Sequence, residues 1–149
     1  MWVYLDASVL VALIADETNR PLVAPYLDPS LGSILVSDFC VAEASAALTS
    51  KGRHLGLAAP LVDQDIARLD EWIDQFAERV RMMTVDVDSA TMAIRRHDVV
   101  LRAPDAIHIA VARRLTATLL TFDRGMARAA AVLGVACIDP ADAPANRKT

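Results

Sequence analysis

Four acidic residues stand where carboxylates can do chemistry. Asp6 ends a short apolar run, Asp105 follows a proline suited to a helix start, and Asp123 follows a β-rich run. Glu43 lies among small and apolar residues. Carboxylate oxygens without cysteine are ligands for Mg²⁺ or Mn²⁺ and not for zinc, and these ions activate water and stabilise the leaving oxygen of a phosphodiester. If the fold brings them together, the four acids predict a metal site that hydrolyses phosphodiesters.

Each of the three aspartates also has a structural interpretation. A short acid at a strand-to-helix junction accepts hydrogen bonds from the first amides of the helix and favours its positive end. Glu43 differs, because no basic residue lies within one helical turn of it to form a local ion pair. Burying an unpaired carboxylate is costly. Glu43 therefore lies either on a thin exposed polar stripe or facing a cleft that uses its charge.

Strands and helices alternate along the chain. Apolar or β-rich runs predict strands over residues 2–5, 33–36, 80–85, 116–122 and 135–138. We expect helices over residues 7–15, 21–27, 37–50, 60–78, 88–97, 104–114 and 124–133, the third of them ending at Lys51-Gly52. This alternation predicts a three-layer α/β/α sandwich around a central, mostly parallel five-stranded sheet. In such sheets ligands bind at the carboxyl ends of the strands, where the strand order reverses.

Composition places the chain among ordinary folded domains. Its 149 residues are 54% hydrophobic, and we expect one domain over residues 1–139 with a frayed tail over 140–149. The net charge of −4 provides no general attraction for nucleic acid, so an RNA substrate would need local arginines and bound cations. Cys40 and Cys137 form no CxxC pair and fit buried thiols in a reducing compartment. The early apolar run 7–15 is too short to span a membrane, and we expect a cytoplasmic protein.

Four segments resemble the successive motifs of PIN-domain nucleases, and in size and order the chain looks like the VapC toxins of toxin–antitoxin pairs. The segments are Tyr4-Leu5-Asp6-Ala7-Ser8-Val9-Leu10, Ala42-Glu43-Ala44, Pro104-Asp105-Ala106-Ile107-His108-Ile109-Ala110 and Leu120-Thr121-Phe122-Asp123. Each motif alone is weak, but four in this order make a specific match. The resemblance extends from residue 1 to about residue 138.

The resemblance implies a Mg²⁺- or Mn²⁺-dependent endoribonuclease, the toxin of a type II toxin–antitoxin system. Its acidic metal site corresponds to Asp6, Glu43, Asp105 and Asp123. Ser8 and Thr121 match positions where a hydroxyl holds a carboxylate or water. The implied partners are an RNA substrate, a VapB-type antitoxin and a second copy of the chain. We expect the antitoxin to contact apolar residues of the early helices, namely Leu10, Leu13, Ile14 and Leu22.

Histidine and arginine residues near the last two motifs each have two interpretations. His108 lies one turn after Asp105, so it is either a general base or, as we favour, a histidine satisfied by packing and hydrogen bonds. Arginines there either contact phosphate or form a solvated face. They are Arg95, Arg96, Arg102, Arg113, Arg114, Arg124 and Arg128. We expect Arg124 to bind substrate because it adjoins Asp123.

Two other classes of function compete with a nuclease. Phosphatases of the haloacid dehalogenase type carry DxD after the first strand, whereas Ala7 and Ser8 follow Asp6, and they share with receiver domains a late lysine. The only lysines are Lys51 and Lys148, and no GxxxxGK[ST] P-loop occurs. The remaining alternative is a non-catalytic PIN-like module that binds RNA or a protein. Such a module typically lacks one or more of the acids, and all four are present.

Overall fold

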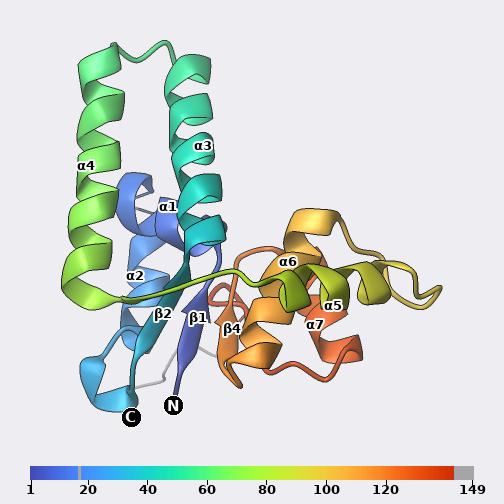
Figure 1. Ribbon diagram of the computed structural model, residues 1–149. Coiled ribbons are helices and arrows are strands. Elements are labelled where there is room, and N and C mark those ends of the chain that lie inside the picture. The colour runs from blue at the N-terminus through green and yellow to red at the C-terminus, as the bar shows by residue number, and fades with distance from the viewer. Residues whose placement is uncertain (17, 143–149) are drawn as a thin grey trace.

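The computed structural model describes residues 1–16 and 18–142, which form three layers (Figure 1). The central layer is a sheet of five short strands: β1 (Val3–Leu5), β2 (Ile34–Ser37), β3 (Glu78–Val80), β4 (Thr118–Leu120) and β5 (Cys137–Ile138). Their order in the sheet is β3-β2-β1-β4-β5, and every neighbouring pair is parallel. The predicted α/β/α fold is confirmed, with a sheet that is parallel throughout.

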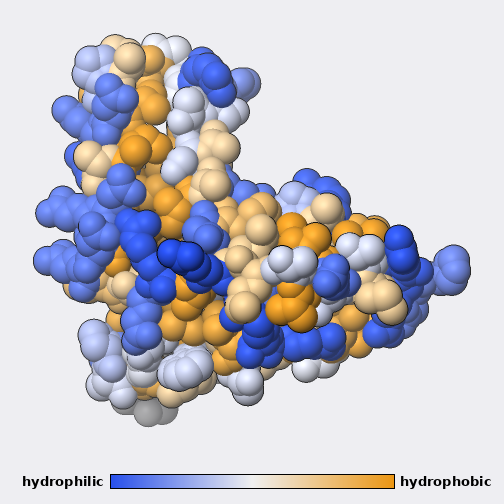
Figure 2. Space-filling model, viewed as in Figure 1, coloured by the Kyte–Doolittle hydropathy of each residue, from blue (hydrophilic) through white to orange (hydrophobic). Residues whose placement is uncertain are grey.

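Helices cover both faces of this sheet. They are α1 (Ala7–Ala15), α2 (Arg20–Val23), α3 (Asp38–His54), α4 (Ala59–Phe76), α5 (Thr84–Ile94), α6 (Ala103–Arg114) and α7 (Arg124–Val132), with 3₁₀ turns η1 (Ala24–Tyr26) and η2 (Pro29–Leu31). Figure 1 shows α3 and α4 as a long hairpin that rises beyond the sheet, while α5, α6 and α7 gather beside β4. The outer side of α4 is hydrophilic (Figure 2), and its buried residues are Leu69 and Ile73.

The period-two alternation of the strands divides the core between the two faces. Val3 and Leu5 point into one cluster with buried residues of α1 to α4. Tyr4, between them, points into the other cluster with Leu119 and buried residues of α6 and α7. Strands buried on both faces read as continuous apolar runs, which is why they were recognisable in the sequence.

The third strand and the helix after it begin earlier than the sequence indicated. β3 is Glu78–Val80 in place of the expected 80–85, and α5 begins at Thr84 in place of 88. The helix begins earlier because the buried carboxylate of Asp86 accepts a hydrogen bond from the Met83 amide at 2.8 Å and so closes the first turn of α5.

The prediction that α3 ends at Gly52 is wrong. The helix runs to His54 and closes at Gly56, whose φ of +64° is the left-handed conformation that glycine adopts most easily. Gly52 is instead buried where α4 packs, and a Cβ there would lie 2.4 Å from Val62 Cγ2. The missing side chain of Gly52 lets α3 and α4 pack closely at this point.

Three expectations from the sequence concern the C-terminal tail, membrane-spanning helices and the two cysteines. Of the expected tail over 140–149, residues 143–149 lie outside the described residues, and 139–142 form a turn in which the Asp142 amide donates to the Asp139 carbonyl. Within residues 1–16 and 18–142, no helix is long and apolar enough to cross a membrane. Cys40 and Cys137 are free thiols, the first buried and the second half-buried.

Candidate acidic site

The topology brings all four acids to one edge of the sheet. The strand order reverses between β1 and β4, which is the switch point where open parallel sheets bind ligands. Asp6 follows β1 directly, and Asp123 follows β4. Glu43 lies in the second turn of α3, which begins where β2 ends, and Asp105 lies in the first turn of α6, which leads into β4. The positive N-terminal ends of four helices therefore meet at this edge and favour negative charge there.

Asp6 is the most deeply held of the four carboxylates. It is 2% exposed and caps α1 by accepting from the Val9 amide at 3.1 Å. The Ser8 hydroxyl donates to the same oxygen at 2.7 Å, and the Thr121 hydroxyl donates to the other at 2.6 Å. Burial raises the pKa of Asp6 above its ordinary value of 3.8, although these hydrogen bonds act in the opposite direction.

Asp123 is also a helix cap, and it is linked to Asp6 through Thr121. Its Oδ1 accepts from the Met126 amide at 2.8 Å, the N-cap contact of α7. Its own amide donates to the Thr121 hydroxyl at 2.9 Å. Thr121 therefore connects the two acids across the switch point, and Asp123 Oδ2 is left to face Arg102.

Arg102 bridges two of the acids. Its Nε lies 3.1 Å from Asp105 Oδ2, and its Nη2 lies 3.4 Å from Asp123 Oδ2. Asp105 does not cap its helix, because the N-cap residue of α6 is Arg102 itself and makes no side-chain cap bond. The Arg102 side chain is 77% exposed, so solvent screens both pairs and each adds little to stability. The bridge shows that the two carboxylates hold a cationic group between them.

Arg102, and not the Arg124 that we expected to bind substrate, is the arginine that contacts these acids. Arg124 is exposed, and its Nη2 lies 3.7 Å from Asp142 Oδ1. Arg102 was one of seven arginines named from the sequence, and its position three residues before Asp105 is the spacing of a helical ion pair. That spacing was the signal that could have distinguished it. Arg114 is structural: it makes a bidentate pair with the buried Asp86.

Glu43 finds its basic partner far away in sequence. His108 of α6 places its Nε2 2.5 Å from Glu43 Oε2. The Glu43 side chain is 31% exposed, while the imidazole is buried. The contact joins α3 to α6 across 65 residues of chain, which explains why no local ion pair could be found around Glu43.

The donor chemistry of this edge suits a hard cation, but the donors do not converge on one point. All four acids offer oxygen, as Mg²⁺ and Mn²⁺ prefer. Among residues 1–16 and 18–142, however, no three acidic, histidine or cysteine side chains stand close enough to hold an ion. Two acids face Arg102, one faces His108, and Asp6 is held by hydroxyls. The residues fit a metal in type and location, and holding one requires Arg102 to leave its two carboxylates and the acids to draw closer together.

Residues 3–132 match the model of the PIN domain family, so the chain belongs to that family. Its fold is similar to VapBC2 from Rickettsia felis, solved with a DNA fragment from its promoter (TM-score 0.71, 14% identity, covering 93% of this chain and 98% of that one). It is also similar to FitAcB from Neisseria gonorrhoeae (TM-score 0.68, 21% identity, 94% and 99%).

A further similar structure is the sarcin–ricin-loop-cleaving toxin VapC20 from Mycobacterium tuberculosis (TM-score 0.64, 18% identity, 85% and 94%). At such identities the likeness establishes a shared fold. A sequence comparison with curated proteins finds no match.

Proposed function

We propose that this PIN-domain chain is a Mg²⁺- or Mn²⁺-dependent endoribonuclease and the toxin of a type II toxin–antitoxin pair. The observation that carries the proposal is the bridge between Asp105 and Asp123, two carboxylates that hold one cationic group at the switch point. Asp6 lies alongside, tied to Asp123 through Thr121. Acids gathered in this way repel one another unless a cation offsets them.

The residues divide into metal ligands and their supports. We expect Asp6, Glu43, Asp105 and Asp123 to hold the metal, with Ser8 and Thr121 keeping Asp6 in place. The bound ion would supply an activated water and stabilise the leaving oxygen of the phosphodiester. A guanidinium binds phosphate as it binds carboxylate, so Arg102 is suited to hold a substrate phosphate once a metal ion replaces it. The exposed Arg124 remains a second candidate for phosphate contact.

Cleavage of RNA with and without metal tests this proposal. The wild type should cleave single-stranded RNA in Mn²⁺ or Mg²⁺ and lose all cleavage in EDTA. Glu43→Gln and Asp105→Asn should each lower the rate by at least about 100-fold, the upper end of what a residue supporting a metal ligand costs. Asp88→Asn is a matched control, because Asp88 is an exposed acid of α5 outside the site. Binding of RNA without cleavage would instead favour the non-catalytic module.

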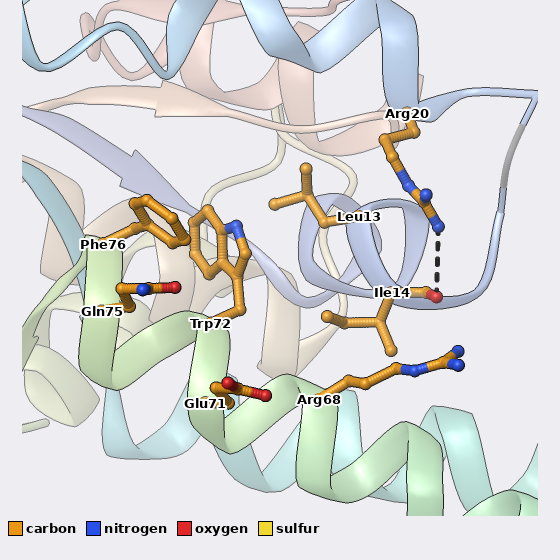
Figure 3. Close-up of a pocket in the computed structure, with 8 residues that line it drawn as sticks. All are labelled: Leu13, Ile14, Arg20, Arg68, Glu71, Trp72, Gln75 and Phe76. Atoms are coloured by element: carbon orange, nitrogen blue, oxygen red, sulfur yellow. Dashed lines mark hydrogen bonds between the residues drawn. The ribbon is translucent and has the colours of Figure 1, made fainter.

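A groove between α1 and α4 supports the antitoxin part of the proposal. Its residues are drawn in Figure 3, its volume is about 600 Å³, and none of the four acids lines it. Leu13, Ile14, Trp72 and Phe76 form its apolar lining, and Arg20, Arg68, Glu71 and Gln75 its polar one. An apolar floor with charged groups around it is what an amphipathic segment of a partner fits. The proposed occupant is a C-terminal segment of the antitoxin.

The structure corrects one residue of the expected antitoxin contact. Leu10 is fully buried in the core and cannot receive an anchor, because its position on α1 faces the sheet. Leu13 and Ile14 do line the groove. Leu22 is 40% exposed but is not among the residues that line it.

Co-expression with the product of the neighbouring reading frame tests the partner. The two proteins should co-purify, and Trp72→Ala should weaken the complex, because a buried tryptophan anchor is worth about 2 kcal/mol or more. Val100→Ala is the control, since Val100 is 95% exposed and lies outside the groove. Equal affinity of the two variants would place the antitoxin elsewhere.

The homodimer is the last part of the proposal. Met83, Val85 and Met92, in or next to α5, are each at least half exposed, and such a group of apolar side chains is suited to cover by a second copy. Light scattering at micromolar concentration should give twice the chain mass. Val85→Asp should give the monomer mass, and a monomeric wild type would contradict the proposal.

A further inference from the structure

A line of hydrogen bonds runs from the interior of the sheet to Glu43. The Tyr4 hydroxyl on β1 lies 2.7 Å from Ser37 Oγ and 2.9 Å from His108 Nδ1. The other imidazole nitrogen, Nε2, contacts Glu43 Oε2 at 2.5 Å. Ser37, Tyr4 and His108 are each at most 1% exposed. Four residues from β1, β2, α3 and α6 are thus joined in one line that ends at an expected metal ligand.

Counting hydrogen atoms assigns the direction of this line. Ser37 Oγ already accepts from the Cys40 amide at 3.0 Å, so its own hydrogen must go to Tyr4. Tyr4 then donates to His108 Nδ1, and the hydrogen on Nε2 goes to the Glu43 carboxylate. In the reverse direction the Ser37 hydrogen has no acceptor among the contacts of the described residues, and such a buried orphan costs about 1–3 kcal/mol. The neutral imidazole with hydrogen on Nε2 satisfies every group.

The imidazole is also fixed in place by its neighbours. Its ring centroid lies 5.8 Å from that of Tyr4 and 5.3 Å from that of Phe39. An imidazole packed against two rings and bonded at both nitrogens can neither flip nor rotate without breaking a contact. The Nε2–H is therefore directed at Glu43 Oε2 alone.

We propose that His108 is a positioning residue: with Tyr4 and Ser37 it fixes Glu43 Oε2 and leaves Oε1 free to meet a divalent cation. The inference rests on the proposed function, because it takes Glu43 as a metal ligand. Carboxylates that bind metals are commonly held by hydrogen bonds from neighbouring groups, and loss of such a neighbour lowers metal affinity by about 10–100-fold. His108 thereby has a use beyond filling the core.

Binding of Mn²⁺ in the absence of RNA tests this, measured by titration calorimetry beside thermal unfolding. His108→Leu should weaken Mn²⁺ binding by about 10–100-fold. His108→Gln keeps an N–H where Nε2 lies and should recover most of that affinity. Tyr4→Phe keeps the imidazole but frees its tautomer, and should cost about tenfold or less. His97→Gln is the control, since His97 is exposed and makes none of the contacts in this line.

The variants distinguish a failure of this inference from a failure of the proposed nuclease function. A wild type that binds and cleaves while folded His108→Leu binds Mn²⁺ equally well would overturn the inference and leave the nuclease standing. Equal loss in His108→Gln and His108→Leu would show that packing, and not the donated hydrogen bond, matters. A wild type that neither binds Mn²⁺ nor cleaves RNA would remove the proposed function and this inference together. If His108→Leu does not fold, Tyr4→Phe decides, with nitrogen NMR expected to show hydrogen on Nε2 in the wild type.

Discussion

Replacing Asp6 by asparagine separates the charge of this residue from its role as a cap. Asparagine caps helices as well as aspartate does, and its oxygen can accept from Ser8 and Val9. The Thr121 hydroxyl, which donates to Asp6 and accepts from the Asp123 amide, loses its acceptor in this variant. Since burial raises the pKa of Asp6, the buried charge opposes folding, and its removal offsets that loss, so Asp6→Asn should be close to the wild type in stability at neutral pH. Cleavage of RNA should nevertheless collapse, because a neutral amide is a poor ligand for Mg²⁺.

Asp6→Ala provides the matched comparison and its magnitude. Alanine removes the cap of α1, worth about 1 kcal/mol. It also removes the acceptor of the Ser8 hydroxyl, a hydrogen bond worth about 0.5–1.5 kcal/mol. Asp6→Ala should therefore be about 1.5–2.5 kcal/mol less stable than Asp6→Asn. For a chain of this length that lowers the melting temperature by about 3–10 °C. Thermal unfolding in EDTA measures the difference.

The difference in stability between Asp6→Asn and the wild type should change with pH in one direction. A carboxyl whose pKa is raised by folding stabilises the folded state while protonated, and that stability is lost as pH rises through the raised pKa. Asp6→Asn has no such loss. The stability of Asp6→Asn relative to the wild type should thus be lowest at the most acidic pH where both fold, and should rise toward neutral pH. A relative stability that falls with rising pH, or full cleavage by Asp6→Asn, would refute the reasoning.

Three further changes test other contacts. Arg102→Gln should raise Mn²⁺ affinity by up to about fivefold, because it removes the cation that competes for two carboxylates through exposed pairs; unchanged affinity in calorimetry would contradict competition. Gly52→Ala should cost about 1–3 kcal/mol in denaturant unfolding by overpacking against Val62, and adding Val62→Ala should recover part of it. Asp86→Ala should cost about 2–4 kcal/mol, since it leaves the partly buried Arg114 unpaired, without changing the cleavage rate per folded molecule.

Local patterns were enough to predict the layers and the edge where the acids lie. Strands buried on both faces leave continuous apolar runs such as Val3–Leu5, and parallel connection sends every carboxyl end to the same edge. The placement of Asp6 and Asp123 follows directly. The start of α5 could not be predicted in this way, because it depends on Asp86 being buried against Arg114, 28 residues away.

The partners of the acids were the least predictable part of the site. Glu43 has no local cation, and nothing in its neighbourhood identifies His108 of α6. Arg102 and Arg124 have equal claims by composition, and only the spacing of Arg102 three residues before Asp105 distinguishes them in the sequence. Contacts between side chains of different elements depend on packing angles that no short pattern encodes.

Capping and metal binding, which the sequence presents as alternatives for the aspartates, are compatible in this fold. A carboxylate has two oxygens, and a helix cap needs only one of them. In Asp123, Oδ1 accepts from the Met126 amide while Oδ2 faces Arg102. The cap fixes the rotation of the side chain, so the second oxygen is directed at the edge of the sheet before any ligand arrives. Glu43 lies inside a helix and can cap nothing, so it needs another group to hold one of its oxygens, and the Nε2–H of His108 supplies it.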